Sequence, residues 1–160
     1  MTSHGKFSTL VLSLIVVVGT MLLPAYAHGQ CNAATIQGRY GFKLNVLFAP
    51  GNGKDQPPIA SYVPGTEAGR IVFAPSSSAS TDGTLTGSQQ GNIGGFPNEL
   101  TFTGNYSVNS DCTGTMTHSF HNGSNVAEFF FVVVQSGNEI EFASHTASTP
   151  RVGDGVMKRQ

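Results

Sequence analysis

The sequence contains no tryptophan, only two cysteines and few charged residues, and these shortages exclude several classes of protein. Asp, Glu, Lys and Arg make up 11% of the 160 residues, which is less than half of the share of about 25% in an ordinary soluble domain. A helical bundle needs many Ala, Leu, Glu and Lys residues, so the composition disfavours one. The formal net charge of −1 provides no electrostatic footprint for phosphates, so we expect no nucleic-acid partner.

Recognisable catalytic signatures are also missing. The sequence has no H-E-x-x-H zinc motif, no phosphate-binding P-loop, no G-x-S-x-G nucleophile motif and no calcium loop. Two histidine pairs, His118 with His145 and His121 with His145, are conceivable metal ligands, but no short-range ligand spacing supports either. From the sequence we therefore assign no catalytic residue, no metal site and no cofactor.

The long hydrophobic run of the chain lies near its start. A short polar segment containing Lys6 precedes Leu10–Leu23, and small residues around Ala27 follow it. This order is typical of a secretory signal peptide, and the run is shorter than the roughly 20 apolar residues of a transmembrane helix. We therefore predict a signal peptide over 1–27 that is cleaved after Ala27, with a retained anchor as the alternative.

The predicted export to the periplasm or the extracellular space bears on the redox state of the two cysteines. Cys31 and Cys112 are the two cysteines of the chain, and a bridge between them would close a loop of 112 − 31 = 81 residues. In an oxidising compartment an isolated pair most simply forms one structural disulfide. A redox pair or two metal ligands are the alternatives, but neither has the usual close cysteine spacing.

The mature chain, 28–160, consists of short alternating segments separated by turn signals, and it has no second hydrophobic run of membrane length. The alternation is strictest in Leu100–Val108, and Asn122-Gly123 is the strongest hairpin signal. We predict strands over Ile36–Phe48, Ile59–Val63, Ala68–Ala74, Thr84–Gly91, Leu100–Val108, Gly114–Phe120, Val126–Gln135, Glu139–Ser144 and Val152–Lys158.

This strand pattern predicts an all-β domain. We favour a single antiparallel up-and-down β-barrel of about eight strands, because the order is meander-like and the last strands can pair with the first. Closure also removes the sheet edges that invite aggregation. An immunoglobulin-like sandwich is the alternative, but it would be expected to contain a core tryptophan. An eight-stranded interior is either filled by side chains or holds one small ligand.

Two segments carry a resemblance to a known group of proteins. They are Cys31–Phe42 (CNAATIQGRYGF) and Thr103–Thr115 (TGNYSVNSDCTGT). Together they resemble small, mostly uncharacterised secreted bacterial proteins with a C-x-x-A-T-x-x-G-x-Y-G-F run and a central D-C-T-G-T run. The resemblance implies a small barrel similar in outline to lipocalins and to the allene oxide cyclase barrel, and it implies no catalytic residues.

The apolar faces of the predicted strands suggest an interior that could take a ligand. His118 shares a face with apolar neighbours and could be a polar contact in an apolar cavity. Glu128 alternates with apolar residues and is the acid for which we expect partial burial. The candidate ligand-binding residues are Tyr40, Phe42, Leu44, Met116, His118, Phe120, Glu128, Phe130 and Val132.

Phe129–Val134 is apolar on both faces, whereas the outer face of an eight-stranded barrel is normally wet. A second subunit could cover that face, so this strand suggests a homo-oligomer.

The sequence leaves three functions open. The first is a secreted barrel that binds a small apolar ligand, and the second is a structural or surface-interaction protein without a cavity. The third is an enzyme of the cyclase or isomerase type, for which we expect a buried His118 or Glu128 facing open space.

Overall fold

The computed structural model describes residues 30–48, 62–120, 123, 125–144 and 151–160. The predicted signal peptide over 1–27, the predicted strand over Ile59–Val63 except its last residues, and the histidines His121 and His145 lie outside the described residues. Within the described ranges, no helix has the length and apolarity needed to cross a membrane.

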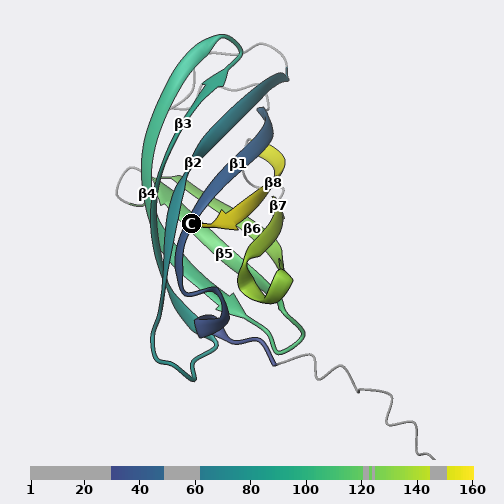
Figure 1. The fold of residues 1–160 in the computed structure, drawn as a ribbon. Helices are drawn as coiled ribbons and strands as arrows, with labels where there is room; N and C mark the ends of the chain where they lie inside the picture. Colours follow the sequence, from purple (N-terminus) through teal and green to yellow (C-terminus); the bar gives the residue numbers. More distant parts are fainter. Residues whose placement is uncertain (1–29, 49–61, 121–122, 124, 145–150) are drawn as a thin grey trace, which may run out of the picture.

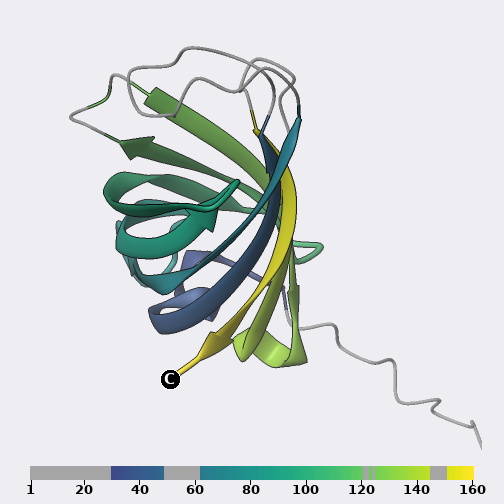
Figure 2. The same cartoon turned by 90° about the horizontal axis from the view of Figure 1, so that it is seen from above.

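Eight antiparallel strands form a closed barrel, seen from the side in Figure 1 and from above in Figure 2. Each strand pairs with the next one along the chain, and the last pairs back with the first. The predicted up-and-down barrel is confirmed, and the sandwich alternative is wrong. The strands are β1 (Gly38–Phe48), β2 (Val63–Pro75), β3 (Asp82–Ile93), β4 (Phe96–Val108), β5 (Thr113–Phe120), β6 (Asn125–Val134), β7 (Glu139–Ser144) and β8 (Arg151–Arg159).

Several strand boundaries differ from the prediction by a few residues, and two of the differences concern predicted turns. Pro64-Gly65 does not end a strand, because β2 runs through it. Pro64 is the second residue of β2 and lies beyond Gly65, the last residue that β2 pairs with β3, a position where a missing N–H is tolerated. The gap between the predicted strands Thr84–Gly91 and Leu100–Val108 narrows to a tight turn, since Gly94 and Gly95 both have positive φ (56° and 96°), as tight hairpin turns require.

One end of the barrel is closed by the segment before β1, and we call it the disulfide end. The predicted bond between Cys31 and Cys112 is confirmed, with the two Cα atoms 5.0 Å apart. The short 3-10 helix η1 (Ala33–Ile36) follows, and Ala33 and Ile36 are fully buried. Asn32 caps η1 by accepting a hydrogen bond from the Thr35 backbone N–H. The disulfide therefore anchors a plug of chain under the barrel.

A hydrogen-bond cluster joins this plug to the seam between β8 and β1. Arg159 Nη2 donates to Tyr40 Oη and to the Thr35 carbonyl oxygen, both at 2.8 Å. The Tyr40 hydroxyl itself donates to the Gly137 carbonyl oxygen. Burial raises the pKa of Tyr40, and the Arg159 guanidinium partly opposes that shift. The Tyr40 hydroxyl is thus held by Arg159 and the Gly137 carbonyl in the closed end of the barrel.

Candidate functional site

A belt of aromatic rings crosses the interior of the barrel at mid-height. Neighbouring ring centroids lie 4.2 to 6.5 Å apart. The pairs close into a circle, because each ring contacts two others. Aromatic pairs at these separations stabilise beyond the area they bury. The aromatic belt consists of Phe42, Phe102, His118, Phe129 and Phe142.

A glycine on the neighbouring strand leaves space for one of the belt rings. Gly87 of β3 pairs directly with Phe102 of β4, and a Cβ added to Gly87 would lie 2.3 Å from Phe102 Cζ. A larger residue would therefore displace the ring that stacks on His118. This is the close approach for which a glycine inside a strand is used.

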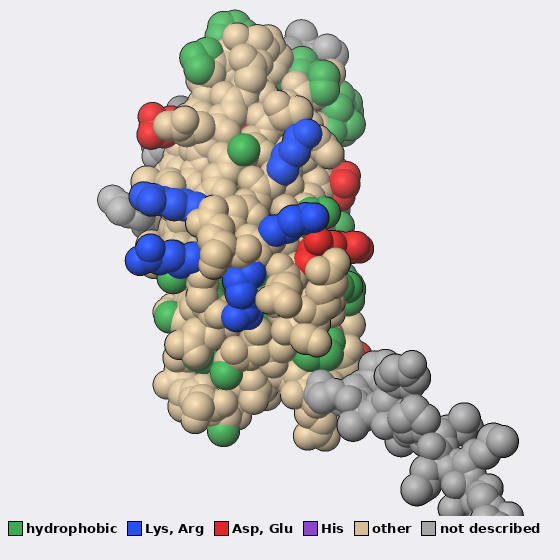
Figure 3. Space-filling model, viewed as in Figure 1, with side chains coloured by type: hydrophobic (Ala, Val, Ile, Leu, Met, Phe, Trp, Pro, Cys, Tyr) green, Lys and Arg blue, Asp and Glu red, His purple; other side chains and the backbone are tan. Residues whose placement is uncertain are grey.

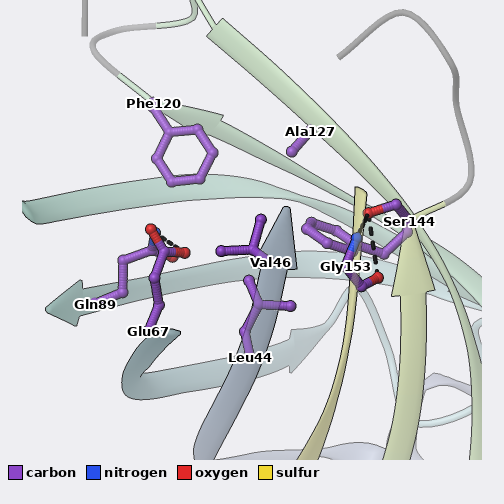
Figure 4. Close-up of a pocket in the computed structure, with 9 residues that line it drawn as sticks. Leu44, Val46, Glu67, Gln89, Phe120, Ala127, Ser144 and Gly153 are labelled. Atoms are coloured by element: carbon purple, nitrogen blue, oxygen red, sulfur yellow. Dashed lines mark hydrogen bonds between the residues drawn. The ribbon is translucent and has the colours of Figure 1, made fainter. Parts of the chain in front are cut away.

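Every second residue of a strand points inward, so successive inward side chains lie at different heights in the barrel. The belt is one such layer, and it has a further layer of inward side chains on either side. The layer toward the disulfide end is filled by large side chains, and Phe73, Phe131 and Met157 in it are at most 1% exposed. The other layer lies toward the end where β1 stops at Phe48. It contains the candidate pocket, which is lined by Leu44, Val46, Glu67, Gln89, Phe120, Ala127, Phe129, Ser144 and Gly153 (Figure 4).

The pocket is nearly closed by its own side chains. The space open to the centre of a water molecule is about 10 Å³, which is room for about one water. Its walls are mostly apolar, and the small residues Ala127 and Gly153 lie among them. On the β7–β8 side, Ser144 Oγ accepts a hydrogen bond from the Gly153 backbone N–H at 2.9 Å, drawn in Figure 4. Any ligand larger than water must therefore displace side chains.

A buried glutamate and a buried amide form the larger polar part of this pocket, and a second, half-buried amide supports them from outside its lining. Glu67 of β2 and Gln89 of β3 are only 2% and 3% exposed. Gln89 Nε2 donates to Glu67 Oε2 at 2.7 Å, and Figure 4 shows the two side-chain ends meeting. Asn98 Nδ2 of β4 donates to Glu67 Oε1 at 3.3 Å. We call Glu67, Gln89 and Asn98 the carboxylate–amide group.

The strand register explains how these residues meet. Glu67 pairs with Gly91 on β3, and Gln89 is two residues away on the same face. A Cβ on Gly91 would lie 2.7 Å from Glu67 Cγ, so the missing side chain leaves space for the glutamate. Residues on one face of a sheet at diagonal positions are within reach of long side chains. The carboxylate–amide group is therefore built into the sheet and not carried by loops.

His118 is the ionisable member of the belt. Its ring stacks on Phe102 with centroids 4.2 Å apart and planes at 12°, and it is only 3% exposed. Desolvation by burial lowers the pKa of the imidazole to about 3, so the ring is neutral above that pH. Among the described residues, no group is within hydrogen-bonding distance of His118 Nε2.

The predicted ligand-binding residues divide into three groups. Leu44 and Phe120 line the pocket. Phe42 and His118 belong to the aromatic belt beneath it. The others do not line the pocket: Tyr40 and Met116 are buried in the filled layer, and Glu128, Phe130 and Val132 lie on the outer face of β6.

The prediction that Glu128, Phe130 and Val132 of β6 point into the barrel is therefore wrong. Phe130 is 40% exposed, whereas Phe129 and Phe131 are 6% and 0% exposed. Met116 pairs with Phe129 and Thr117 with Glu128, so the register places Glu128 outside. This arrangement avoids burying an unpaired carboxylate, which is costly. Because Phe129–Val134 is apolar on both faces, its composition alone did not distinguish the inside from the outside.

The prediction missed the carboxylate–amide group. A signal was present: counting back in steps of two from the inward Phe73 and Ile71 reaches Gly69 and Glu67. The face was overlooked because its glycine and glutamate carry no apolar pattern, and the Gly65 turn signal suggested a break. Within the described ranges, no three His, Cys, Asp or Glu side chains come together as a metal site.

The fold and the pocket define a closed eight-stranded antiparallel barrel with a polar group inside one half. No protein-family model and no curated protein sequence matches the chain. Designed β-barrels among the solved structures are similar to it in fold. The redesigned barrel b11L5F_LGL is 16% identical with a TM-score of 0.55, and the match covers 81% of this chain and 96% of that one.

Two further designed barrels give the same result. A fluorescence-activating β-barrel designed de novo is 16% identical with a TM-score of 0.53, covering 81% of this chain and 99% of that chain. The redesigned barrel mFAP1, bound to DFHBI, is 20% identical with a TM-score of 0.51, covering 79% of this chain and 97% of that chain. These similarities support the small barrel fold that the resemblance implied, and they identify no family.

Proposed function

We propose that the protein is a binding barrel for a small, mostly apolar ligand that carries one hydrogen-bond donor. The observation that carries this proposal is the carboxylate–amide group in the wall of an otherwise apolar interior pocket. In this proposal the ligand body packs against Leu44 and Phe120, and its donor reaches the group around Glu67.

The energetics of the pocket favour a functional origin for its polar wall. Burying a carboxylate costs several kcal/mol unless hydrogen bonds compensate, and well-packed apolar residues at such positions are often as stable or more stable. Every other large side chain that lines the pocket is apolar. A hydrogen-bonded polar group kept in an otherwise apolar wall is typical of a ligand site, where a few placed polar groups orient the bound molecule.

Because the pocket is nearly closed, a side chain in its wall would have to move before a ligand could enter. Phe120 is the last residue of β5, and a change of its side-chain rotamer would enlarge the pocket without breaking the strand ladder. The similar barrel mFAP1 is bound to DFHBI in its solved structure, so this small aromatic molecule is a reasonable first probe. A ligand that must displace side chains is expected to associate more slowly than one that enters an open cavity.

Thermal-shift measurements on the mature chain, 28–160, test this proposal. Fatty acids, isoprenoid alcohols and DFHBI serve as probes, and at least one should raise the melting temperature in proportion to the logarithm of its concentration. The control is Ala127→Val, which occupies the small open space with two added methyl groups and should reduce the shift, and its own melting temperature verifies that it is folded. If no apolar probe stabilises the wild-type chain, or if Ala127→Val keeps the full shift, the proposal is wrong.

A second candidate is a surface-interaction protein that associates through the outer face of β6, β7 and β8. Phe130 and Val156 on this face are 40% and 37% exposed, and Val132 and Val156 are both cross-strand partners of Glu141. Light scattering tests this candidate, since a strict monomer at high concentration would count against it. For either candidate we propose a periplasmic or extracellular location, because the disulfide fits an oxidising compartment.

A further inference from the structure

Four basic side chains surround Gly41 on the outer face of the barrel. Arg39 and Lys43 lie two residues to either side of it on β1, so they share its face. Arg70 of β2 and Lys158 of β8 are its direct cross-strand partners. All four are exposed, and Figure 3 shows Lys and Arg side chains gathered on this face. We call these four side chains the basic cluster.

The side chains around the two arginines of the cluster carry little negative charge. Lys158 Nζ lies 3.2 Å from Glu139 Oε2 and is therefore paired. Arg39 and Arg70 line an outer groove of about 440 Å³ whose lining contains no Asp or Glu side chain. Gln160 also lines it, with its N–H bonded to the Arg39 carbonyl oxygen at 3.0 Å, so the α-carboxylate of the 28–160 chain offsets part of this positive charge. Because the chain as a whole has a net charge of −1, this groove is a local concentration of positive charge.

The groove continues from the arginines over neutral hydroxyl groups. Arg70 pairs with Ser88 on β3, and Ser88 pairs with Thr101 on β4, so the three side chains form a row across the sheet. Thr86 also lines the groove. From Gly41 to Thr101 the row spans three inter-strand steps, or about 14 Å. The groove is therefore long enough for a chain of linked groups and not only for a single ion.

We infer that this groove binds an acidic oligosaccharide, with its carboxylate or sulfate groups at Arg39 and Arg70 and its hydroxyls at Ser88 and Thr101. The planar guanidinium group matches a carboxylate or sulfate with two parallel hydrogen bonds. Serine and threonine hydroxyls both donate and accept, as sugar hydroxyls do. A membrane surface fits less well, because Val72 is the one exposed large apolar residue in the described lining.

Calorimetric titration of the mature chain tests the inference. The probes are a hexagalacturonate, a sulfated heparin hexasaccharide and the neutral cellohexaose. We expect at least one acidic probe to bind at 50 mM salt, to weaken as salt is raised to 200 mM, and cellohexaose not to bind. Arg70→Gln should weaken the binding about tenfold or more, as the loss of a charge-assisted hydrogen bond does.

Lys43→Gln is the matched control. It removes the same charge from the same face, but Lys43 does not line the groove, so we expect less than a threefold change. Both positions are exposed, and unchanged melting temperatures would verify that the variants are folded. Equal weakening by Arg70→Gln and Lys43→Gln would overturn the inference. It would indicate that the probes are attracted by the overall positive charge of this face and not bound at a specific site in the groove.

Two further measurements separate other anions from an oligosaccharide. Inorganic sulfate should compete only at concentrations far above those of the acidic hexasaccharides, since it occupies one part of the groove. Vesicles of phosphatidylglycerol and phosphatidylcholine should not sediment with the protein. Binding to the vesicles without binding to either acidic probe would contradict the inference, and so would the absence of all binding. The groove lies outside the barrel, so Ala127→Val should leave this binding unchanged.

Discussion

Inside the barrel, Gln89 Nε2 donates a hydrogen bond of 2.7 Å to Glu67 Oε2, and both side chains are almost fully buried. The two residues lie on neighbouring strands, and the same group contains Asn98. This relationship makes the pocket polar at one wall, where the cost of burying polar groups has to be offset by their hydrogen bonds.

The first prediction concerns that cost. Gln89→Leu removes a donor from a buried carboxylate and should lower the free energy of unfolding by about 1–3 kcal/mol. Glu67→Leu combined with Gln89→Leu should recover most of the loss, because apolar pairs replace buried polar pairs at little cost. Urea denaturation measures both variants. A double variant less stable than Gln89→Leu would contradict this account.

The second prediction tests the facing of β6. Phe131 is fully buried, so Phe131→Ala should lower the free energy of unfolding by about 3–5 kcal/mol. Phe130→Ala is the matched control, and because Phe130 is 40% exposed it should cost less than about 1 kcal/mol. Chemical denaturation distinguishes the two. Equal losses would mean that the strand does not have this register.

The third prediction concerns the stability of the barrel at acidic pH. The pKa of His118 is lowered from 6.5 to about 3 by burial, so below pH 6.5 the unfolded chain binds a proton that the folded chain does not. Stability is therefore full above pH 6.5 and falls toward pH 3, by up to about 1.4 kcal/mol per pH unit. His118→Phe should reduce this slope and leave stability at pH 7 unchanged or higher, since it removes the buried Nε2.

Thermal melts of the wild type and His118→Phe between pH 7 and pH 4 measure the difference. NMR provides an independent check, because the His118 ring signals should not titrate above pH 4 in the folded state. An ordinary titration near pH 6.5 would show that the ring is not buried as described.

The fourth prediction concerns the contact between β4 and β5. A Cβ on Gly104 would lie 1.7 Å from the Thr117 carbonyl oxygen, and next to it Asn105 N–H donates to Thr117 Oγ1 at 3.2 Å. Gly104→Ala should therefore cost about 3 kcal/mol or more, as severe overpacking does. Gly41→Ala is the control, because the one close neighbour of its Cβ would be the flexible Gln160 side chain. Similar melting temperatures for both variants would contradict the close approach.

The prediction from sequence succeeded where a signal was local. Alternation along Leu100–Val108 gives the inward and outward faces of β4 directly, because side chains alternate with a period of two and this strand is polar on one face. It failed at β6, where Phe129–Val134 is apolar on both faces. It also failed at Pro64-Gly65, where turn residues occur inside a long strand because the ladder to β3 ends there.

The sequence alone determined the closed eight-stranded barrel and the bond between Cys31 and Cys112, since strand periodicity, turn residues and a lone cysteine pair are all readable along the chain. Only the tertiary structure decided the residue arrangements on which the two proposed sites rest. The register between strands joins Glu67 to Gln89 and places Arg39 and Arg70 along one groove, and that register is set by how the interior packs. No spacing along the chain encodes these two arrangements, because the residues of each pair are 22 or more positions apart.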